Sequence, residues 1–106
     1  MPINNILMGY IYSASSAKIA RVDDMGQVYS LSGQHLGKIA GDGHVFDLNG
    51  HQSGHIDSSG RVFGPAGQVG TVHSDGKIYD YEGHWIGKSE PPHVEFGGAA
   101  LLLLIR

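Results

Sequence analysis

The side chains best suited to chemistry in this sequence are its histidines, and the chemistry they suggest is metal binding. The imidazole ring is a common ligand of zinc and related metals. The spacing shows no compact pairing of a histidine with acidic or cysteine partners, so we expect surface histidines, no metal site and no cofactor. The seven histidines are His35, His44, His51, His55, His73, His84 and His93.

Aspartates could supply acid–base catalysis, and a glycosidase needs two carboxylates at a defined separation. Turn chemistry alone explains repeated aspartates, because the Asp side chain accepts hydrogen bonds from the backbone of its own turn. No serine lies in a nucleophile-elbow motif, and no glycine cluster has phosphate-loop spacing. We therefore predict no catalytic residue and no enzymatic activity. The recurring aspartates are Asp42, Asp47, Asp57, Asp75 and Asp80.

Aromatic residues are the most suggestive binding groups. Strands in a common register would place the recurring aromatics on one face, as core or rim packing or as a surface for a sugar, lipid or peptide. Trp85 departs from this pattern, because it takes the position that His35 and Gln52 hold elsewhere. Trp85, Tyr81 and His84 are the candidate ligand contacts, although Trp85 could instead cap one end of the fold. The recurring aromatics are Tyr12, Tyr29, Phe46, Phe63 and Tyr79.

An internal repeat organises these residues. A motif of glycine, a polar residue, a β-branched residue and an aromatic begins at Gly26, Gly43, Gly60 and Gly76, at spacings of 17, 17 and 16 residues. A degenerate first copy begins at Gly9, 17 residues before Gly26. Such self-similarity is typical of repeat architectures. We divide the single domain 1–106 into units at about 9–25, 26–42, 43–59, 60–75 and 76–90, a linker 91–96 and an apolar helix 97–106.

Each unit reads as two short strands and two turns. A β-branched residue followed by an aromatic favours a strand. Residues 47–50 form a turn in which Asp47 bonds the backbone and Gly50 accepts a left-handed conformation. Asp42-Gly43 is a hairpin signature. Connections this short force antiparallel neighbours, so we predict a meander of about ten strands that closes into a shallow all-β barrel.

The C-terminal run Gly97–Arg106 is the strongly apolar segment of an otherwise polar, glycine-rich chain. A helix of about ten residues spans roughly 15 Å, which matches the roughly 16 Å of a five-residue strand. We expect Pro91-Pro92 to end the last strand and Gly97-Gly98 to turn the tail into the barrel as a central helix. Two alternatives stay open: insertion into a membrane surface, and packing against other copies of the chain. The apolar run is too short to span a bilayer, which needs about 20 residues.

These motifs resemble a known family. Tandem Gly-x-Val-Tyr-Asp-x-x-Gly-x-x-x-Gly-x-Ile units ending in Gly-Gly-Ala-Ala-Leu-Leu-Leu-Leu are similar to the β-flower family of small bacterial proteins. The resemblance covers roughly Gly9 to Ile105 and implies a pseudo-symmetric barrel around an apolar centre. The architecture is also similar to tubby-like lipid-binding barrels around a central helix, at the level of the fold alone.

Composition narrows the partners. The net charge is −3, and lysines and arginines are scattered singly, which disfavours nucleic acid and tight docking on anionic lipid. The sequence holds no cysteine and shows no signal-peptide pattern, so we expect a cytoplasmic protein, with a membrane-peripheral location left open.

We therefore predict a non-enzymatic binding or scaffold module. Its partner is a protein, a lipid or a small ligand, and a homo-oligomer stays open. The alternative function is a lipid- or membrane-associated module similar to tubby-like barrels.

Overall fold

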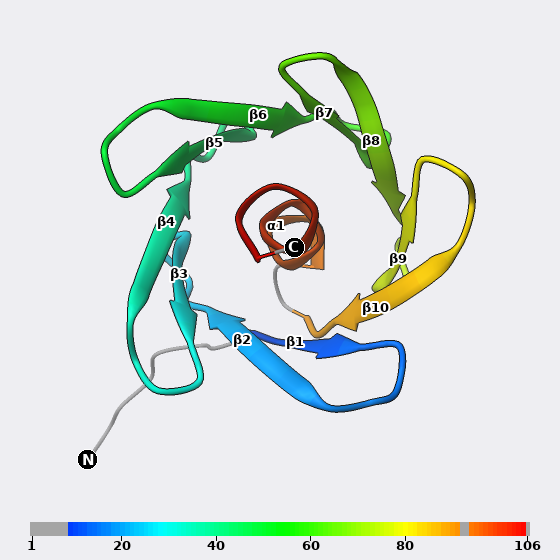
Figure 1. Ribbon diagram of the computed structural model, residues 1–106, viewed down its shortest axis with the longest axis horizontal. Coiled ribbons are helices and arrows are strands. Elements are labelled where there is room, and N and C mark those ends of the chain that lie inside the picture. The colour runs from blue at the N-terminus through cyan, green and yellow to red at the C-terminus, as the bar shows by residue number, and fades with distance from the viewer. Residues whose placement is uncertain (1–8, 92–93, 106) are drawn as a thin grey trace.

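The chain forms one closed antiparallel barrel of ten strands around a central helix (Figure 1). The computed structural model describes residues 9–91 and 94–105. Pro92, His93 and Arg106, which figured in the sequence expectations, lie outside the described residues. The strands are β1 (Gly9–Ser13), β2 (Lys18–Val22), β3 (Gln27–Ser30), β4 (His35–Ile39), β5 (His44–Asp47), β6 (Gln52–Ile56), β7 (Arg61–Gly64), β8 (Gly67–Val72), β9 (Lys77–Asp80) and β10 (Trp85–Ser89).

Every strand pairs with its neighbours in the sequence, and the first strand pairs with the last. β1 and β10 are antiparallel, with Ile11 opposite Ser89 and Ser13 opposite Gly87. The side chain of Glu90 reinforces this closure, because it accepts hydrogen bonds from the Tyr10 backbone N–H at 3.2 Å and from the Tyr12 hydroxyl at 3.0 Å. Closure removes the two free edges that an open meander would expose. The predicted all-β barrel with a single C-terminal helix is confirmed.

The turns form by the side-chain chemistry expected from the sequence. In the β6–β7 turn, Asp57 Oδ1 accepts hydrogen bonds from the backbone N–H groups of Ser59 at 3.0 Å and Arg61 at 2.9 Å. Gly60 takes a φ of +90°, which residues with a side chain rarely adopt. Asp47 and Asp80 make the same pair of backbone bonds in their own turns. Local sequence therefore fixes where the chain reverses.

These bonds predict acid sensitivity. The backbone N–H of Arg61, together with bonds from Ser59, lowers the pKa of Asp57 from 3.8 to about 2. Because the folded-state pKa is lowered, the stabilisation is complete above the unfolded-state value and is lost as the pH falls through about 2. We expect the melting temperature to fall as the pH drops from about 4 towards 2, and to fall less in Asp57→Asn. The melting temperature of both proteins can be measured against pH by circular dichroism. The same fall in both proteins would contradict this role of Asp57.

The barrel interior is lined by the β-branched residue of each unit rather than by its aromatic. Val28, Val45, Val62 and Ile78 are fully buried. Because successive strand residues point to opposite faces, the aromatic that follows each of them lies on the outer wall. Tyr29, for example, is half-buried between strands beside the guanidinium of Arg21, 5.1 Å from the ring centroid. The recurring aromatics therefore pack against the outside of the wall.

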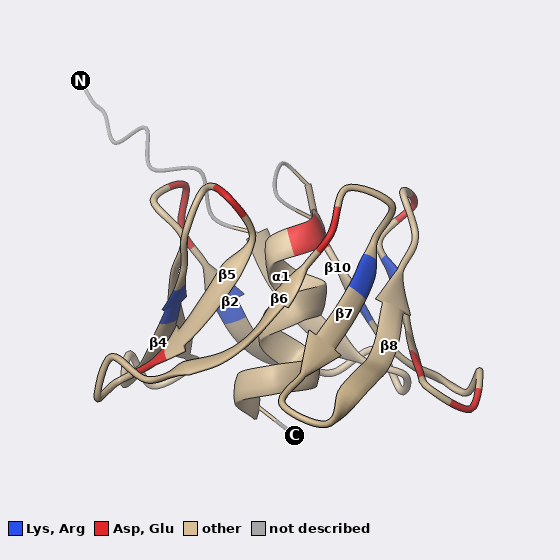
Figure 2. Cartoon of the chain, turned by 90° about the horizontal axis from the view of Figure 1, so that it is seen from above, with Lys and Arg blue, Asp and Glu red and all other residues tan. Residues whose placement is uncertain are grey.

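The central helix begins earlier than expected. It consists of α1 (Val94–Ala100), an α-helix, and η1 (Leu101–Ile105), a π-helix, and both run through the middle of the barrel (Figures 1 and 2). Residues 94–96, which the sequence assigned to the linker 91–96, belong to α1, and the predicted turn at Gly97-Gly98 is wrong because both glycines lie inside this helix.

Close packing explains these two glycines. A Cβ on Gly97 would overlap Ser89, and a Cβ on Gly98 would overlap Val72. The Ser89 hydroxyl also donates a hydrogen bond of 2.6 Å to the Val94 carbonyl, which ties the start of the helix to β10. These glycines allow the helix to pack close to the barrel wall because they have no side chain. Their conformational freedom is not required, since both lie inside the helix.

Four successive leucines of the tail contact four successive units. In each case a Leu δ-methyl carbon lies 2.8–2.9 Å from the point where a Cβ on a wall glycine would stand. The wall glycines therefore make room for the leucines, which fill the barrel. The pairs are Leu101 with Gly87, Leu102 with Gly70, Leu103 with Gly54 and Leu104 with Gly37.

The π-helical winding of η1 suits this arrangement. An α-helix rotates by about 100° per residue, whereas five units around a barrel lie about 72° apart. Hydrogen bonding from residue i to i+5 lowers the rotation per residue, so successive side chains reach successive units more evenly. The first unit carries Ala20 at the position of the wall glycines, and Ile105 is the next residue of the tail.

Candidate functional site

One end of the barrel carries the end of the central helix together with the turn inside each unit. Leu102 lines a groove with Tyr81 and Glu82 of the β9–β10 turn, whereas Phe96, near the start of α1, lines one with Asp57 of the β6–β7 turn. We call the end with Leu102 the C-terminal end. Figure 2 shows the end of the central helix at the lower end of the view.

Exposed large apolar side chains gather at this end. Leu31, Leu48 and Tyr81 hold the same position in three equivalent turns and are 49%, 57% and 72% exposed. Trp85 begins β10 at the same end and is 46% exposed. Among the described residues, the remaining exposed large apolar side chain is Met25, in the β2–β3 turn at the opposite end.

The end of the helix adds to this surface. Leu103, Leu104 and Ile105 are partly buried, whereas Leu101 and Leu102 deeper in the barrel are only 5% and 8% exposed. Large exposed apolar patches on proteins mark interaction sites more often than scattered apolar residues do. We call the following set the apolar patch: Leu31, Leu48, Tyr81, Trp85, Leu103, Leu104 and Ile105.

Grooves separate neighbouring units at this end. The groove between the fourth and fifth units has a volume of about 490 Å³ and is lined by Gln68, Val69, Asp80, Tyr81, Glu82 and Leu102. The groove between the second and third units has about 430 Å³, and its lining includes His35, Phe46, Asp47 and Leu48. Both fall within the size range of small-ligand sites.

Trp85 stands in the wall of a smaller groove, where the barrel closes. This groove, of about 280 Å³, is lined by Tyr12, Ser13, Ser16, Trp85, Lys88 and Glu90. The indole N–H of Trp85 donates a hydrogen bond of 2.7 Å to the Gly87 carbonyl. Gln52 and Gln68, at the equivalent positions, donate longer bonds of 3.4 Å to the matching glycine carbonyls. Trp85 thus replaces a glutamine while keeping its bond, which holds the ring at the surface.

The three residues singled out from the sequence do not share one pocket. Tyr81 lines the groove on one side of the fifth unit, and Trp85 lines the groove on the other side. His84 lies in the turn between them. The sequence interpretation missed Leu31 and Leu48, although their shared position with Tyr81 in the repeat was a visible signal.

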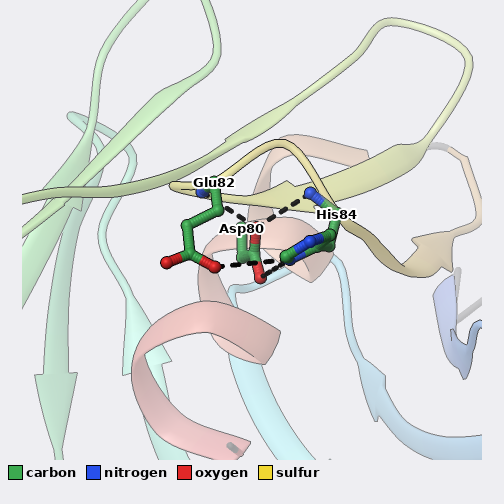
Figure 3. A group of neighbouring side chains, drawn as sticks. All are labelled: Asp80, Glu82 and His84. Atoms are coloured by element: carbon green, nitrogen blue, oxygen red, sulfur yellow. Dashed lines mark hydrogen bonds and ion pairs between the residues drawn. The ribbon is translucent and has the colours of Figure 1, made fainter.

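His84 meets two carboxylates, which the sequence interpretation did not expect (Figure 3). Its Nδ1 lies 3.2 Å from Asp80 Oδ2 and 3.6 Å from Glu82 Oε1. One ligand atom from each of these residues lies within 4.8 Å of the others, which is close enough for one divalent cation. The expectation that no histidine pairs compactly with acidic residues is therefore wrong.

Turn chemistry accounts for this cluster without a metal. Asp80 Oδ1 accepts hydrogen bonds from the backbone N–H groups of Glu82 at 3.0 Å and His84 at 2.9 Å. These bonds, the one from His84 first, lower the pKa of Asp80. The equivalent turn places His51 Nδ1 3.9 Å from Asp47 Oδ2 and has Asn49 where the cluster has Glu82.

In residues 9–91 and 94–105, no helix combines the length and the apolar character required to cross a membrane. No family model, no curated protein and no solved structure matches the chain.

Proposed function

We propose that this protein is a non-enzymatic binding module that docks a partner on the apolar patch. The observation that carries the proposal is the gathering of Leu31, Leu48 and Tyr81 on turns around the half-exposed end of the central helix. The barrel does not need these three side chains for its core, because its interior is filled by Leu101, Leu102 and the wall residues.

The polar groups near the patch support binding rather than catalysis. The carboxylate of Asp80 is engaged by backbone N–H groups of its turn. That of Glu90, which lines the groove beside Trp85, holds Tyr10 and Tyr12. Carboxylates occupied in this way position backbone, and they are poorly placed to exchange protons with a substrate. The resemblance to β-flower proteins adds no catalytic motif.

A lipid- or membrane-associated module is the second candidate. Apolar side chains on turn tips around an apolar helix end could dip into the interface of a bilayer. The observation that favours it is the position of Leu31 and Leu48 on two separate turns at the same end. The likeness to tubby-like barrels points in the same direction.

The test compares three immobilised proteins as bait in quantitative affinity capture. We expect the wild type to retain a specific set of proteins. A triple variant that combines Leu31→Ser, Leu48→Ser and Tyr81→Ser should retain about tenfold less of them or even less, because apolar contacts dominate docking energy. Met25 is also apolar and exposed, but it lies at the opposite end of the barrel. The Met25→Ser variant is therefore the matched control and should retain the same set of proteins.

Equal capture by all three proteins would contradict the proposal. Sedimentation with vesicles of neutral phosphatidylcholine tests the second candidate with the same variants. Pelleting of the wild type and the control, but not of the triple variant, would favour the lipid module. Circular dichroism melting of each variant ensures that the comparison is made on folded protein.

A further inference from the structure

The apolar patch is bordered by negative charge. At the C-terminal end the turns and strand ends carry the carboxylates of Asp47, Asp80 and Glu82 and the ammonium group of Lys18, which begins β2. Two further lysines line the grooves, Lys38 beside Asp47 and Lys88 beside Trp85. Figure 2 shows acidic segments, in red, at this lower end. The Glu82 side chain is 76% exposed, so its charge is directed to solvent rather than to the barrel.

The carboxylates border two of the grooves at this end. Asp80 and Glu82 lie on the groove of about 490 Å³ beside Val69, Tyr81 and Leu102. Asp47 lies on the groove of about 430 Å³ beside Leu48, but Lys38 of the same chain lines this groove too and offsets its charge. The smaller groove of about 220 Å³ between the third and fourth units has Gly64 and Pro65 at the equivalent positions and no carboxylate in its lining. In the groove of about 490 Å³, apolar side chains and an acidic lip therefore occur together without a lysine or arginine in the lining.

This combination matches the side chains of lysine and arginine. Their aliphatic stems cover apolar surface while the charged head stays at the edge in water. A carboxylate at the lip can pair with that head, and arginine can form two parallel bonds to it. Complementary charge mainly sets which partner binds and how fast.

The same charges disfavour two other occupants. A bilayer rich in anionic lipid would repel this end. A second copy docked face to face would bring the same three carboxylates towards their own counterparts, and like charges across an interface are unfavourable.

We infer that the apolar patch takes a protein segment that presents apolar side chains flanked by lysine or arginine, with a basic side chain seated in the groove of about 490 Å³ beside Glu82. This inference rests on the proposed function, because it names the chemistry of the partner that docks there. It assigns the apolar residues to affinity and the carboxylate of Glu82 to selection.

The test uses two synthetic amphipathic helical peptides with the same leucine pattern, one with lysine and one with glutamate at the polar positions. Trp85 is the sole tryptophan of the chain and belongs to the patch, so its fluorescence reports binding. We expect the lysine peptide to shift the emission and to bind at least tenfold more tightly than the glutamate peptide. Higher salt should weaken its binding, because exposed charges are screened.

Variants separate charge from apolar contact. Glu82→Gln should lower the affinity for the lysine peptide about two- to fivefold, as expected for loss of an exposed ion pair. Asp24→Asn, in the β2–β3 turn at the opposite end, should leave this affinity unchanged. The combined serine variant of Leu31, Leu48 and Tyr81 should weaken both peptides.

Equal affinity for the two peptides would overturn the inference and leave docking on the apolar patch standing. Preference for the glutamate peptide, or no binding of either, would overturn it as well. In those cases the affinity capture with the same serine variant decides the proposed function independently. If Asp24→Asn weakens binding of the lysine peptide as much as Glu82→Gln does, the assignment of the peptide to this end is overturned.

Discussion

A protein that ends at Gly98 is expected not to fold into a stable barrel at 25 °C. The truncation removes Ala99 and Ala100, which are fully buried, and Leu101 and Leu102, which are 5% and 8% exposed. Burying two leucines stabilises a protein by roughly 3–6 kcal/mol, and the three partly buried residues that follow add to this. The total stability of a typical domain is only about 5–15 kcal/mol.

The wall offers no substitute for the lost tail. The positions that the leucines cover are glycines, so no wall side chain can move in to fill the space. Circular dichroism and urea denaturation would show loss of a cooperative transition. A truncated protein that still melts cooperatively at an unchanged temperature would overturn the role of the tail as the core.

A point substitution gives a graded version of this experiment. Leu102→Ala should cost about 2–5 kcal/mol, in the range measured for buried leucines replaced by alanine. Leu48→Ala, at an exposed position in a turn, is the control and should stay within about 0.5 kcal/mol of the wild type.

The barrel was predictable because the sequence states it repeatedly. Each unit carries its own turn residues, such as Asp57 and Gly60, and its own inward β-branched residue, such as Val62. Turn chemistry and the alternation along a strand are local effects, so they can be read without knowing the fold. Repetition then fixes the connectivity, because a meander of short antiparallel strands closes most simply by joining β1 to β10.

The start of the helix was not predictable from local effects. A Gly-Gly pair lowers helix propensity, which favours a turn over a helix interior. In the structure the pair nevertheless lies inside a helix, because a tertiary contact outweighs the local preference. Only a residue without a side chain fits between the helix and Val72 or Ser89. A contact between Gly98 and Val72, far apart in sequence, leaves no trace in the local pattern.

The candidate site was partly predictable. Trp85 was identifiable because it breaks the repeat, and Tyr81 because it is an aromatic in a turn. Leu31 and Leu48 share their repeat position with Tyr81, but a leucine in a turn carries no signal of its exposure. Their position beside the end of the central helix depends on how the turns assemble at one end of the barrel, which no local pattern shows.

The sharpest test of helix–wall packing is Gly98→Ala, which is expected to destabilise the protein. Alanine is about 1 kcal/mol better than glycine inside a helix, so propensity alone predicts a gain. Its Cβ would overlap the side chain of Val72, and overpacking of this kind costs roughly 3 kcal/mol at the upper end of the usual range. We expect a net loss of roughly 2 kcal/mol in urea denaturation, because the overlap outweighs the propensity.

Two further variants decide whether this overlap is the cause. Gly41→Ala adds a methyl group where nothing lies within 4 Å, so it should leave the stability within about 0.5 kcal/mol of the wild type. Val72→Ala removes the methyl groups that the new Cβ would meet, so Gly98→Ala should cost less in that background, with a coupling of roughly 1 kcal/mol or more between the two sites. A stabilised Gly98→Ala variant, or equal costs in both backgrounds, would show that helix propensity and not contact with the wall governs this position.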